Sequence, residues 1–384
     1  MQLSVFVLAV CLGLASGQGF FGGGALPGLG NVGNVAGGVA NGLAGGLNTL
    51  ASGAQQGFSS ISGGLAQVPL LNNVQDFGDF LQQTGKTYAN AAEQALRQGV
   101  FEGSQNLVDS ANAAFAAGTS TFTSAVNAFS DLTHLEFLKQ LTGFKKSAEG
   151  ESRVAAARQA VEVPAEPIPD AFDWREKGGV TPVKNQGTCG SCWTFAATGA
   201  IEGHLFRKTN QLPNLSEQNL VDCGPLNFGL NGCDGGCQEY AFAFLKEAQR
   251  GIASEAKYTY VDKRDVCSYT EKQAEAYVHG LATITPNDED LLKKVVATLG
   301  PVGCSLFADE ALLHYDKGIF NNATCNGQDL NHAVLVVGYG NENGQDYWTI
   351  KNSWGENWGE NGYFRLIRGQ NFCGISLECS YPIV

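Results

Sequence analysis

One cysteine and one histidine carry the most informative chemistry in this sequence. The segment from Gln186 to Trp193 reads Gln-Gly-Thr-Cys-Gly-Ser-Cys-Trp, and His332 opens an apolar run 140 residues after Cys192. An ordinary thiol, with a pKa of about 8.5, is ionised in about one molecule of three thousand at pH 5, yet only the thiolate is a useful nucleophile. A histidine can activate the thiol by holding the pair as thiolate and imidazolium. We therefore predict that Cys192 is a nucleophile and that His332 activates it.

The residues that follow this pair indicate how each side chain is positioned. Apolar residues repeat at helical spacing after Cys192, at Ala197, Ala200, Ile201 and Leu205. This predicts a helix that begins near Cys192, where N–H groups and the helix dipole lower the pKa of a thiol. His332 heads a predicted strand that would hold its ring rigidly. The predicted strands cover residues 333–339, 347–350 and 363–367.

Two other interpretations of Cys192 compete with the nucleophile. A zinc site is possible by spacing, because two cysteine pairs are separated like metal ligands: Cys189 with Cys192, and Cys233 with Cys237. Zinc ligation needs neither the adjacent Trp, nor the upstream Gln, nor a distant His, so we expect no metal. A disulfide at Cys192 would leave His332 and Asn352 without a purpose.

The segment around Cys192, together with His332 and Asn352, resembles the signature of papain-family cysteine proteases. There, Cys-Gly-Ser-Cys-Trp precedes the His and the Asn by roughly 130 to 150 residues. Asn352 lies 160 residues after Cys192, a difference that loop lengths absorb. The sequence most resembles the cathepsin L branch. The resemblance implies an α+β papain-like fold of two domains, helical on the left and β-barrel-like on the right, with the active-site cleft between them.

The same resemblance implies a cysteine endopeptidase that works through an acyl-enzyme and needs no cofactor. Asn352 would accept the far ring N–H of His332, and Gln186 would donate to the developing oxyanion. Trp193 and Trp354 would support the site. The implied partners are protein and peptide substrates, the protein's own prodomain as inhibitor, and cystatin-like inhibitors. The enzyme would be made as a zymogen and activated by removal of the prodomain at acid pH.

Substrate selection is also implied by resemblance. Gly235 and Gly236 would offer an extended backbone edge to the substrate. The S2 pocket would be lined by Gln238, Ser305, Leu330, Ala333 and Glu378. Glu378 stands where cathepsin L-like enzymes often carry a small apolar residue, so we expect Arg to be accepted at P2 beside apolar or aromatic side chains. A solvated glutamate near the C-terminus is the alternative.

Composition and motifs divide the chain into five segments. Residues 1–17 hold an apolar stretch followed by small residues, as a secretory signal peptide does. Residues 18–70 are Gly-rich and of low complexity, and we expect a flexible spacer, with self-association as the alternative. By resemblance, the remaining segments are a helical inhibitory prodomain at 71–145, an exposed activation linker without helical pattern at 146–167, and the mature protease domain at 168–384.

One face of a long predicted helix matches the inhibitory-propeptide motif of cathepsin L-like precursors. The matching residues are Glu93, Arg97, Phe101, Val108 and Asn112, followed by Asn127, Phe129 and Asp131. Ser104 departs from the motif, which has Asn there, and Ala125 stands where Gly is usual. A helical hairpin without inhibitory function fits the periodicity equally well, but its position ahead of a protease domain favours the prodomain.

Ten of the eleven cysteines follow Thr188, which suggests disulfides in one domain and a secretory compartment. The resemblance implies three disulfides: Cys189 with Cys233, Cys223 with Cys267, and Cys325 with Cys373. Apart from the nucleophile, three cysteines then remain: Cys237, Cys304 and Cys379. At least one of them should be a free thiol. Asn214 and Asn322 head glycosylation sequons.

The bulk properties exclude some functions. A net charge of −13 disfavours nucleic acid and anionic membranes as partners, because both select a basic surface. No segment reaches the eighteen or so consecutive apolar residues of a transmembrane helix. We expect an enzyme that is lysosomal or is secreted for extracellular or digestive use, and that is monomeric when mature. The alternative is a binding protein that retains a protease-like fold.

Overall fold

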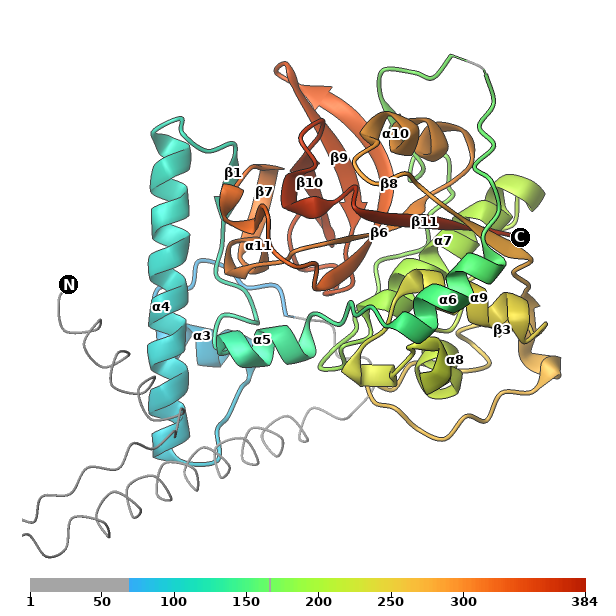
Figure 1. Cartoon of the computed structure of the whole chain (residues 1–384). Coiled ribbons are helices and arrows are strands. Elements are labelled where there is room, and N and C mark those ends of the chain that lie inside the picture. The colour runs from blue at the N-terminus through green and yellow to red at the C-terminus, as the bar shows by residue number, and fades with distance from the viewer. Residues whose placement is uncertain (1–68, 166) are drawn as a thin grey trace, which may run out of the picture. The chain divides into compact units, whose positions relative to one another are not determined.

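The computed structural model describes residues 69–165 and 167–384 (Figure 1). The signal peptide expected at 1–17 and all but the end of the spacer expected at 18–70 lie outside the described residues. We call residues 69–165 the N-terminal segment and residues 167–384 the C-terminal domain; both belong to one compact unit. No helix among the described residues is long and apolar enough to cross a membrane.

The long helix predicted for the N-terminal segment is present, and a shorter helix precedes it. In α3 (Phe77–Thr84) the Asp76 side chain caps the first turn, and in α4 (Ala91–Ala116) Asn90 does the same. The side chains that α4 buries follow one another at spacings of three or four residues: Glu93, Arg97, Phe101, Ser104 and Val108. The predicted motif residues of α4 therefore face inward, with Asn112 half-buried at the end of the row.

Two further helices continue the N-terminal segment. The helix α5 (His134–Gln140) begins with a capping box formed by Thr133 and Glu136. The helix α6 (Ala148–Ala157) corrects our expectation of an exposed linker without helix after residue 146. It lies against α9 (Gln238–Glu247), with Val154 fully buried (Figure 1). A Cβ on Gly150 would come within 2.3 Å of the Tyr240 ring, so glycine permits this close packing.

A mixed sheet forms most of the second half of the C-terminal domain. Its strands run in the order β1-β7-β10-β9-β8-β6-β11-β5, and β2 pairs with β8. All neighbours are antiparallel except β7 and β10. The bounds are β1 (Phe122–Ser124), β2 (Phe172–Asp173), β5 (Gly280–Thr283), β6 (Val302–Leu306), β7 (Tyr315–Phe320), β8 (His332–Glu342), β9 (Gln345–Lys351), β10 (Tyr363–Ile367) and β11 (Glu378–Ile383). The three predicted strands are confirmed as β8, β9 and β10. Strand β1 comes from the N-terminal segment and extends the sheet at β7.

Helices precede and flank this sheet. They are α7 (Cys192–Thr209), α8 (Glu217–Cys223), α9, α10 (Glu289–Thr298) and α11 (Glu310–Leu313), with a short sheet of β3 (Ile252–Ala253) and β4 (Ala274–Ala276). Short 3-10 helices are η2 (Leu226–Phe228), η3 (Gly232–Asp234), η4 (Glu271–Gln273), η5 (Ala323–Cys325) and η6 (Phe372–Gly374). The helix predicted after Cys192 is confirmed as α7.

The strand β8 separates two hydrophobic cores. Ala333, Leu335 and Val337 belong to the core of α6, α7 and α9, whereas Val334 and Val336 belong to the core of the sheet and α10. Alternate residues of a strand face opposite sides, so one strand contributes to both cores. The expected α+β fold of a helical and a β-rich domain is therefore present, and the first residue of β8 lies where the two domains meet.

Four disulfides crosslink the C-terminal domain. Three have the pairing that the resemblance implied: Cys189 with Cys233, Cys223 with Cys267, and Cys325 with Cys373. The fourth joins Cys304 to Cys379, which lie opposite each other on β6 and β11. Among the described cysteines, Cys192 and Cys237 are free.

Candidate active site

The thiol of Cys192 lies at the N-terminus of α7 and is completely buried. The backbone N–H of Ala333 donates to its Sγ at 3.4 Å. Because Ala333 follows His332 at the start of β8, this contact brings the predicted histidine to the cysteine across the boundary between the two domains. The structure thus assembles in space two residues that lie 140 positions apart in the sequence.

Two neighbours fix the ring of His332. Its Nε2 lies 2.8 Å from Oδ1 of Asn352, and its ring stacks on Trp354 with centroids 4.8 Å apart. Its Nδ1 is buried and has no hydrogen-bond partner among the described residues. One ring nitrogen is therefore committed to Asn352, and the other remains available for proton transfer.

Burial governs the charge state of this pair. Burial raises the pKa of the Cys192 thiol to about 12, although the N–H groups of Ala333, Trp193 and Phe144 oppose the increase. Burial also lowers the pKa of His332 to about 4, against the opposing hydrogen bond to Asn352. The predicted effect of the helix N-terminus is thus outweighed here by desolvation. Between pH 5 and 8, cysteine and histidine are therefore both neutral while the site is covered.

Gln186 is fully buried beside the cysteine and makes three side-chain hydrogen bonds. Its Nε2 donates to the main-chain oxygens of Gln140, at 3.1 Å, and Cys189, at 3.0 Å. Its Oε1 accepts from the hydroxyl of Ser353 at 2.7 Å. We did not predict Ser353 from the sequence, although it stands between Asn352 and Trp354 in the same short motif. Ser353 fixes which end of the amide points toward the N-terminal segment.

The N-terminal segment passes over the thiol immediately after α5. Phe144 forms a parallel bridge with Gly236: Gly236 N donates to Gly143 O at 2.9 Å, and Lys145 N donates to Gly236 O at 2.8 Å. A Cβ on Gly143 would lie 2.1 Å from the carbonyl oxygen of Gly190, so only glycine allows the chain to come this close. The backbone edge expected to receive substrate is therefore occupied.

Of the five residues predicted to line S2, Ser305 lies next to three. On β6, Ser305 pairs with Ala333 of β8 on one side and with Glu378 of β11 on the other. Gln238 at the start of α9 lies 3.4 Å from the Ser305 hydroxyl. Leu330 is half-buried just before β8. Glu378 forms an ion pair with Lys146 of the N-terminal segment, with Oε1 of Glu378 2.7 Å from Nζ of Lys146.

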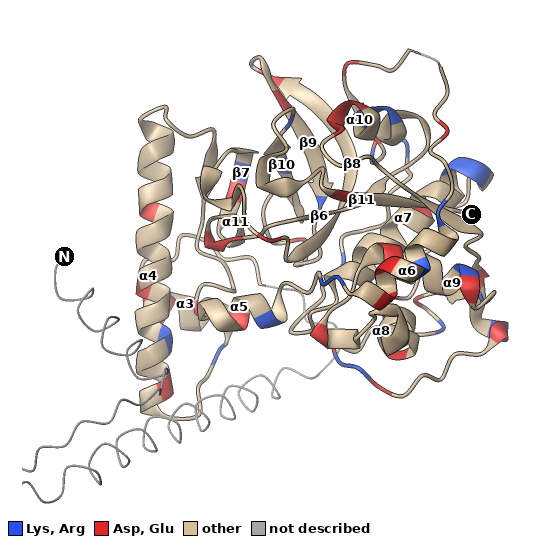
Figure 2. Cartoon of the chain, viewed as in Figure 1, with Lys and Arg blue, Asp and Glu red and all other residues tan. Residues whose placement is uncertain are grey.

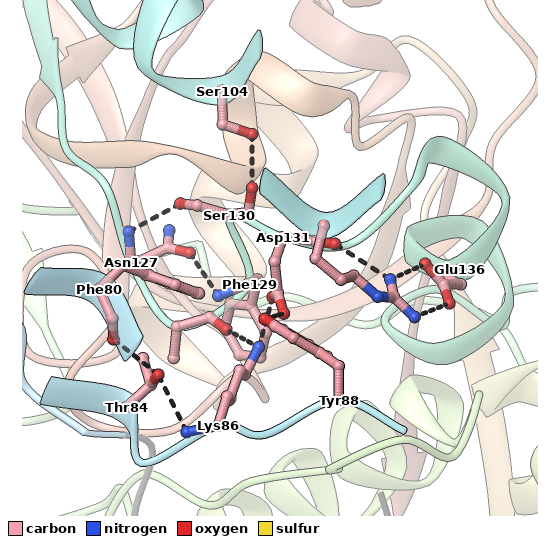
Figure 3. A network of polar contacts seen from close by, with 12 residues as sticks. Phe80, Thr84, Lys86, Tyr88, Ser104, Asn127, Phe129, Ser130, Asp131 and Glu136 are labelled. Atoms are coloured by element: carbon pink, nitrogen blue, oxygen red, sulfur yellow. Dashed lines mark hydrogen bonds and ion pairs between the residues drawn. The ribbon is translucent and has the colours of Figure 1, made fainter. Parts of the chain in front are cut away.

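A polar network ties the elements of the N-terminal segment together (Figure 3). The Asp131 carboxylate binds Lys86 and accepts from the hydroxyl of Tyr88 at 2.7 Å. Arg97 of α4 donates to Glu136 of α5 at 2.7 Å and to the Asp131 main chain at 3.0 Å. Ser104, the departure from the motif, donates to Ser130 O at 2.9 Å, so the position still links α4 to the turn that precedes α5.

The remaining predicted residues lie at one disulfide, at the two sequons and beside Cys192. Cys189 and Cys233 form a disulfide with each other, so they are not ligands of the zinc site considered above. Asn214 is exposed, whereas Asn322 is half-buried and caps η5. Trp193 is fully buried beside the cysteine, and its Nε1 donates to Gly232 O at 3.2 Å.

Comparison with known proteins agrees with this geometry. Residues 168–383 match the model of the papain family cysteine protease, and residues 77–137 match the cathepsin propeptide inhibitor domain. A cathepsin L-like peptidase of Aedes aegypti is 41% identical over 318 residues, which cover 81% of this chain and 93% of the relative. Digestive cysteine proteinase 3 of Homarus americanus is 39% identical over 307 residues, covering 79% and 93%. The structure of digestive procathepsin L 3 from the Tenebrio molitor larval midgut is similar, with a TM-score of 0.73, 39% identity, and coverage of 80% of this chain and 97% of that one.

Proposed function

Since the chain belongs to the papain family of cysteine proteases and carries a cathepsin propeptide inhibitor domain, it is a cysteine endopeptidase precursor, and we propose that its catalytic residues are Cys192, His332, Asn352 and Gln186. One observation carries the assignment: the Cys192 thiol contacts the start of β8, whose first residue is held by Asn352. We propose further that the inhibitory prodomain extends through α6, beyond the residues 77–137 that match the propeptide domain, and we call the whole N-terminal segment the prodomain from here on.

Peptide hydrolysis proceeds in two halves. In the first, the Cys192 sulfur attacks the scissile carbonyl while the imidazolium of His332 gives its proton to the leaving amine, so that a thioester forms and the C–N bond breaks. In the second, His332 takes a proton from water, the hydroxide displaces the thiolate, and the acid product leaves. Asn352 keeps the ring oriented, and Gln186 Nε2 with the backbone N–H of Cys192 stabilises the oxyanion.

The prodomain inhibits by occupying the groups that substrate needs. The Gly236 backbone uses both its donor and its acceptor on the prodomain, and the Gln186 amide binds the Gln140 carbonyl. A substrate strand cannot pair with Gly236 until these bonds break. Removal of the prodomain also exposes the thiol and the imidazole to water, which favours the thiolate–imidazolium pair.

Acid pH is the proposed trigger of activation. The ion pair of Arg97 and Glu136 joins α4 to α5. Burial alone would raise the pKa of Glu136, but the hydrogen bonds from Arg97 and Thr133 hold it below its ordinary value. The stability that this carboxylate contributes is present above its ordinary pKa of about 4.3 and is lost as the pH falls through the lowered value. The prodomain therefore loosens toward the acid side.

The S2 pocket accepts Arg at P2 in addition to apolar and aromatic side chains. Support comes from Glu378, a carboxylate paired across the sheet with Ser305, which already binds a basic side chain in the precursor. A carboxylate that is partly desolvated favours a guanidinium over a neutral side chain.

The enzyme acts in the lysosome or is secreted, for extracellular or digestive proteolysis. Its relatives include a digestive cysteine proteinase and a digestive procathepsin, and its four disulfides suit an oxidising compartment. The mature enzyme is monomeric, is inhibited by cystatin-like proteins and carries glycan at Asn214 or Asn322.

The test is peptide cleavage by the acid-treated precursor under reducing conditions. Wild type and Cys192→Ala are compared on Phe-Arg and Arg-Arg substrates. Thiol-dependent cleavage that disappears in Cys192→Ala supports the nucleophile, and an Arg-Arg rate that falls selectively in Glu378→Gln supports the specificity. A wild type that stays inactive after the prodomain has demonstrably left would instead favour a binding protein.

A further inference from the structure

An acidic site lies at the edge of the cleft, where β11 and α9 begin. Glu378 is the first residue of β11, and Glu239 lies in the first turn of α9. Glu239 is 3% exposed; burial raises its pKa to about 8, and the nearby Glu378 adds to the increase. Glu239 is therefore largely protonated near neutral pH, so Glu378 is the group that can pair with a cation at this edge of the cleft.

The prodomain supplies that cation. The ammonium of Lys146 lies 2.7 Å from Oε1 of Glu378 and 3.0 Å from Oε1 of Glu151 on α6. The side chains of Lys146 and Glu378 are 36% and 25% exposed, so the ion pair is partly desolvated. Lysines appear in blue on the chain between α5 and α6, next to the acidic residues of α6 in red (Figure 2).

The backbone on both sides of this lysine is bound to the C-terminal domain. Lys145 N donates to Gly236 O at 2.8 Å, and Ser147 N donates to the Tyr240 hydroxyl at 2.9 Å. The main chain is therefore already ordered where Lys146 extends toward Glu378. An ion pair formed from an ordered backbone avoids part of the entropy cost that weakens most surface pairs.

We propose that Lys146 occupies the subsite at Glu378 in the precursor, where it takes the place of the basic side chain of a substrate. The prodomain is then retained by the same carboxylate that selects basic substrates after activation. This inference rests on the proposed function, because it takes Glu378 to be a specificity residue of the mature enzyme.

The test measures how often the prodomain leaves the cleft in the intact precursor. Iodoacetamide reacts with Cys192 only when the site opens, so the labelling rate at pH 6.5 reports the fraction of precursor molecules whose site is open. The peptide that contains labelled Cys192 is distinguished from the one that contains Cys237. Lys146→Met should increase the rate about fivefold. Lys145→Met, the matched control on the neighbouring lysine, should leave it unchanged, and Lys146→Arg, which keeps the charge, should remain near wild type.

Variants of the two acidic partners decide which contact matters. Glu378→Gln should raise labelling as much as Lys146→Met, and the double variant should raise it no further. If Glu151→Gln reproduces the effect and Glu378→Gln does not, Lys146 only stabilises the start of α6 and the proposal is wrong. Equal rates in Lys146→Met and Lys145→Met would also overturn it. Thermal unfolding of each precursor identifies any variant that fails to fold. Among the folded variants, the labelling rates of Lys146→Arg and Lys146→Met show whether the charge or the packing of Lys146 retains the prodomain.

The peptide assay separates this inference from the proposed function. Suppose that the mature enzyme cleaves peptides and Glu378→Gln lowers its Arg-Arg rate, but Cys192 in the Lys146→Met precursor is labelled at the wild-type rate. Then only the role of Lys146 in retaining the prodomain is refuted. If Lys146→Met labels faster but Glu378→Gln leaves the P2 preference unchanged, the shared subsite is refuted. Failure of all peptide cleavage refutes the proposed function, while labelling still measures the contact of Lys146.

Discussion

The side-chain amide of Gln186 donates a hydrogen bond of 3.1 Å to the main-chain oxygen of Gln140, the last residue of α5. The donor that we assign to the oxyanion of the substrate therefore binds a carbonyl oxygen of the prodomain in the precursor. Inhibition and catalysis depend on the same N–H group, which is why release of α5 must come before turnover.

Replacing Gln186 by Ala should lower kcat of the processed enzyme by about a hundredfold, because one oxyanion donor is lost. The measurement is kcat and KM on a Phe-Arg substrate, with active sites counted by titration. Gln211→Ala, on an exposed loop residue, is the control and should behave like wild type. A Gln186→Ala enzyme with wild-type kcat would remove Gln186 from the catalytic group.

Ser353 positions Gln186 through the 2.7 Å bond from its hydroxyl to Oε1. We expect Ser353→Ala to lower kcat about tenfold, less than loss of the amide itself, because the amide then samples other orientations. Ser353→Thr keeps the hydroxyl and should restore most of the rate. In the Gln186→Ala background, Ser353→Ala should have no further effect; independent, multiplying effects would contradict the positioning role.

The precursor thiol should react slowly and the mature thiol rapidly at the same pH. Burial raises the pKa of Cys192 to about 12, so the covered thiol is protonated throughout pH 5 to 8 and its reactivity increases only as the pH approaches that value. Labelling by iodoacetamide at pH 5 should be at least about a hundredfold faster once the prodomain has gone. Cys237→Ser should leave this contrast intact, and Cys192→Ala should abolish it.

His314 should contribute to release of the prodomain by acid. It is 2% exposed, its Nδ1 lies 3.4 Å from the hydroxyl of Ser130 in the prodomain, and burial lowers its pKa to about 4. Release opens this face to water, where the ordinary histidine pKa is about 6.5. The released state therefore binds a proton that the bound state does not, and binding weakens as the pH falls from about 6.5 to 4, by up to about tenfold per unit.

The variant His314→Gln should flatten that dependence. The measurement is the rate of Cys192 labelling in the intact precursor across pH 4 to 7, where the slope should decrease relative to wild type. His134→Gln is the matched control, because His134 is an exposed histidine that faces Glu310 in the same region of the molecule. If both variants keep the wild-type slope, carboxylates alone account for the acid response.

Local patterns in the sequence predicted the parts of the site that carry a motif. The helix after Cys192 and the strand after His332 follow from the spacing of nearby apolar residues. The inward face of α4 follows from the propeptide motif and not from apolar spacing, since Leu96 and Leu107 of this helix are exposed. Cys304 and Cys379 are 75 residues apart in the sequence. The disulfide between them could not be predicted from local patterns, because it depends on the register of β6 against β11. The same is true of Lys146 and Glu378, which meet only after the chain has crossed the cleft.

The helix α6 was missed for a different reason. Its buried positions are Gly150, Val154 and Ala157, and two of these are too small to stand out as a hydrophobic face among the alanines around them. Its position is set by partners on α9, which include Tyr240 at Gly150 and Glu247, whose carboxylate pairs with Arg153 at 2.6 Å. The tertiary contact, and not the helical propensity of the segment, determines where this helix lies.

A docked α6 means that cutting the chain and freeing the enzyme are separate events. Proteases act on exposed, irregular backbone. The chain after α6 is irregular at residues 160–165, where all but the half-buried Val161 and Val163 are exposed, whereas the bonds within α6 are protected by its packing on α9. A first cut would therefore leave a nicked complex, in which a prodomain that is no longer covalently attached still covers Cys192. Such an intermediate would keep the activity latent in transit, and dilution or acid, rather than peptide-bond cleavage, would set the moment at which proteolysis begins.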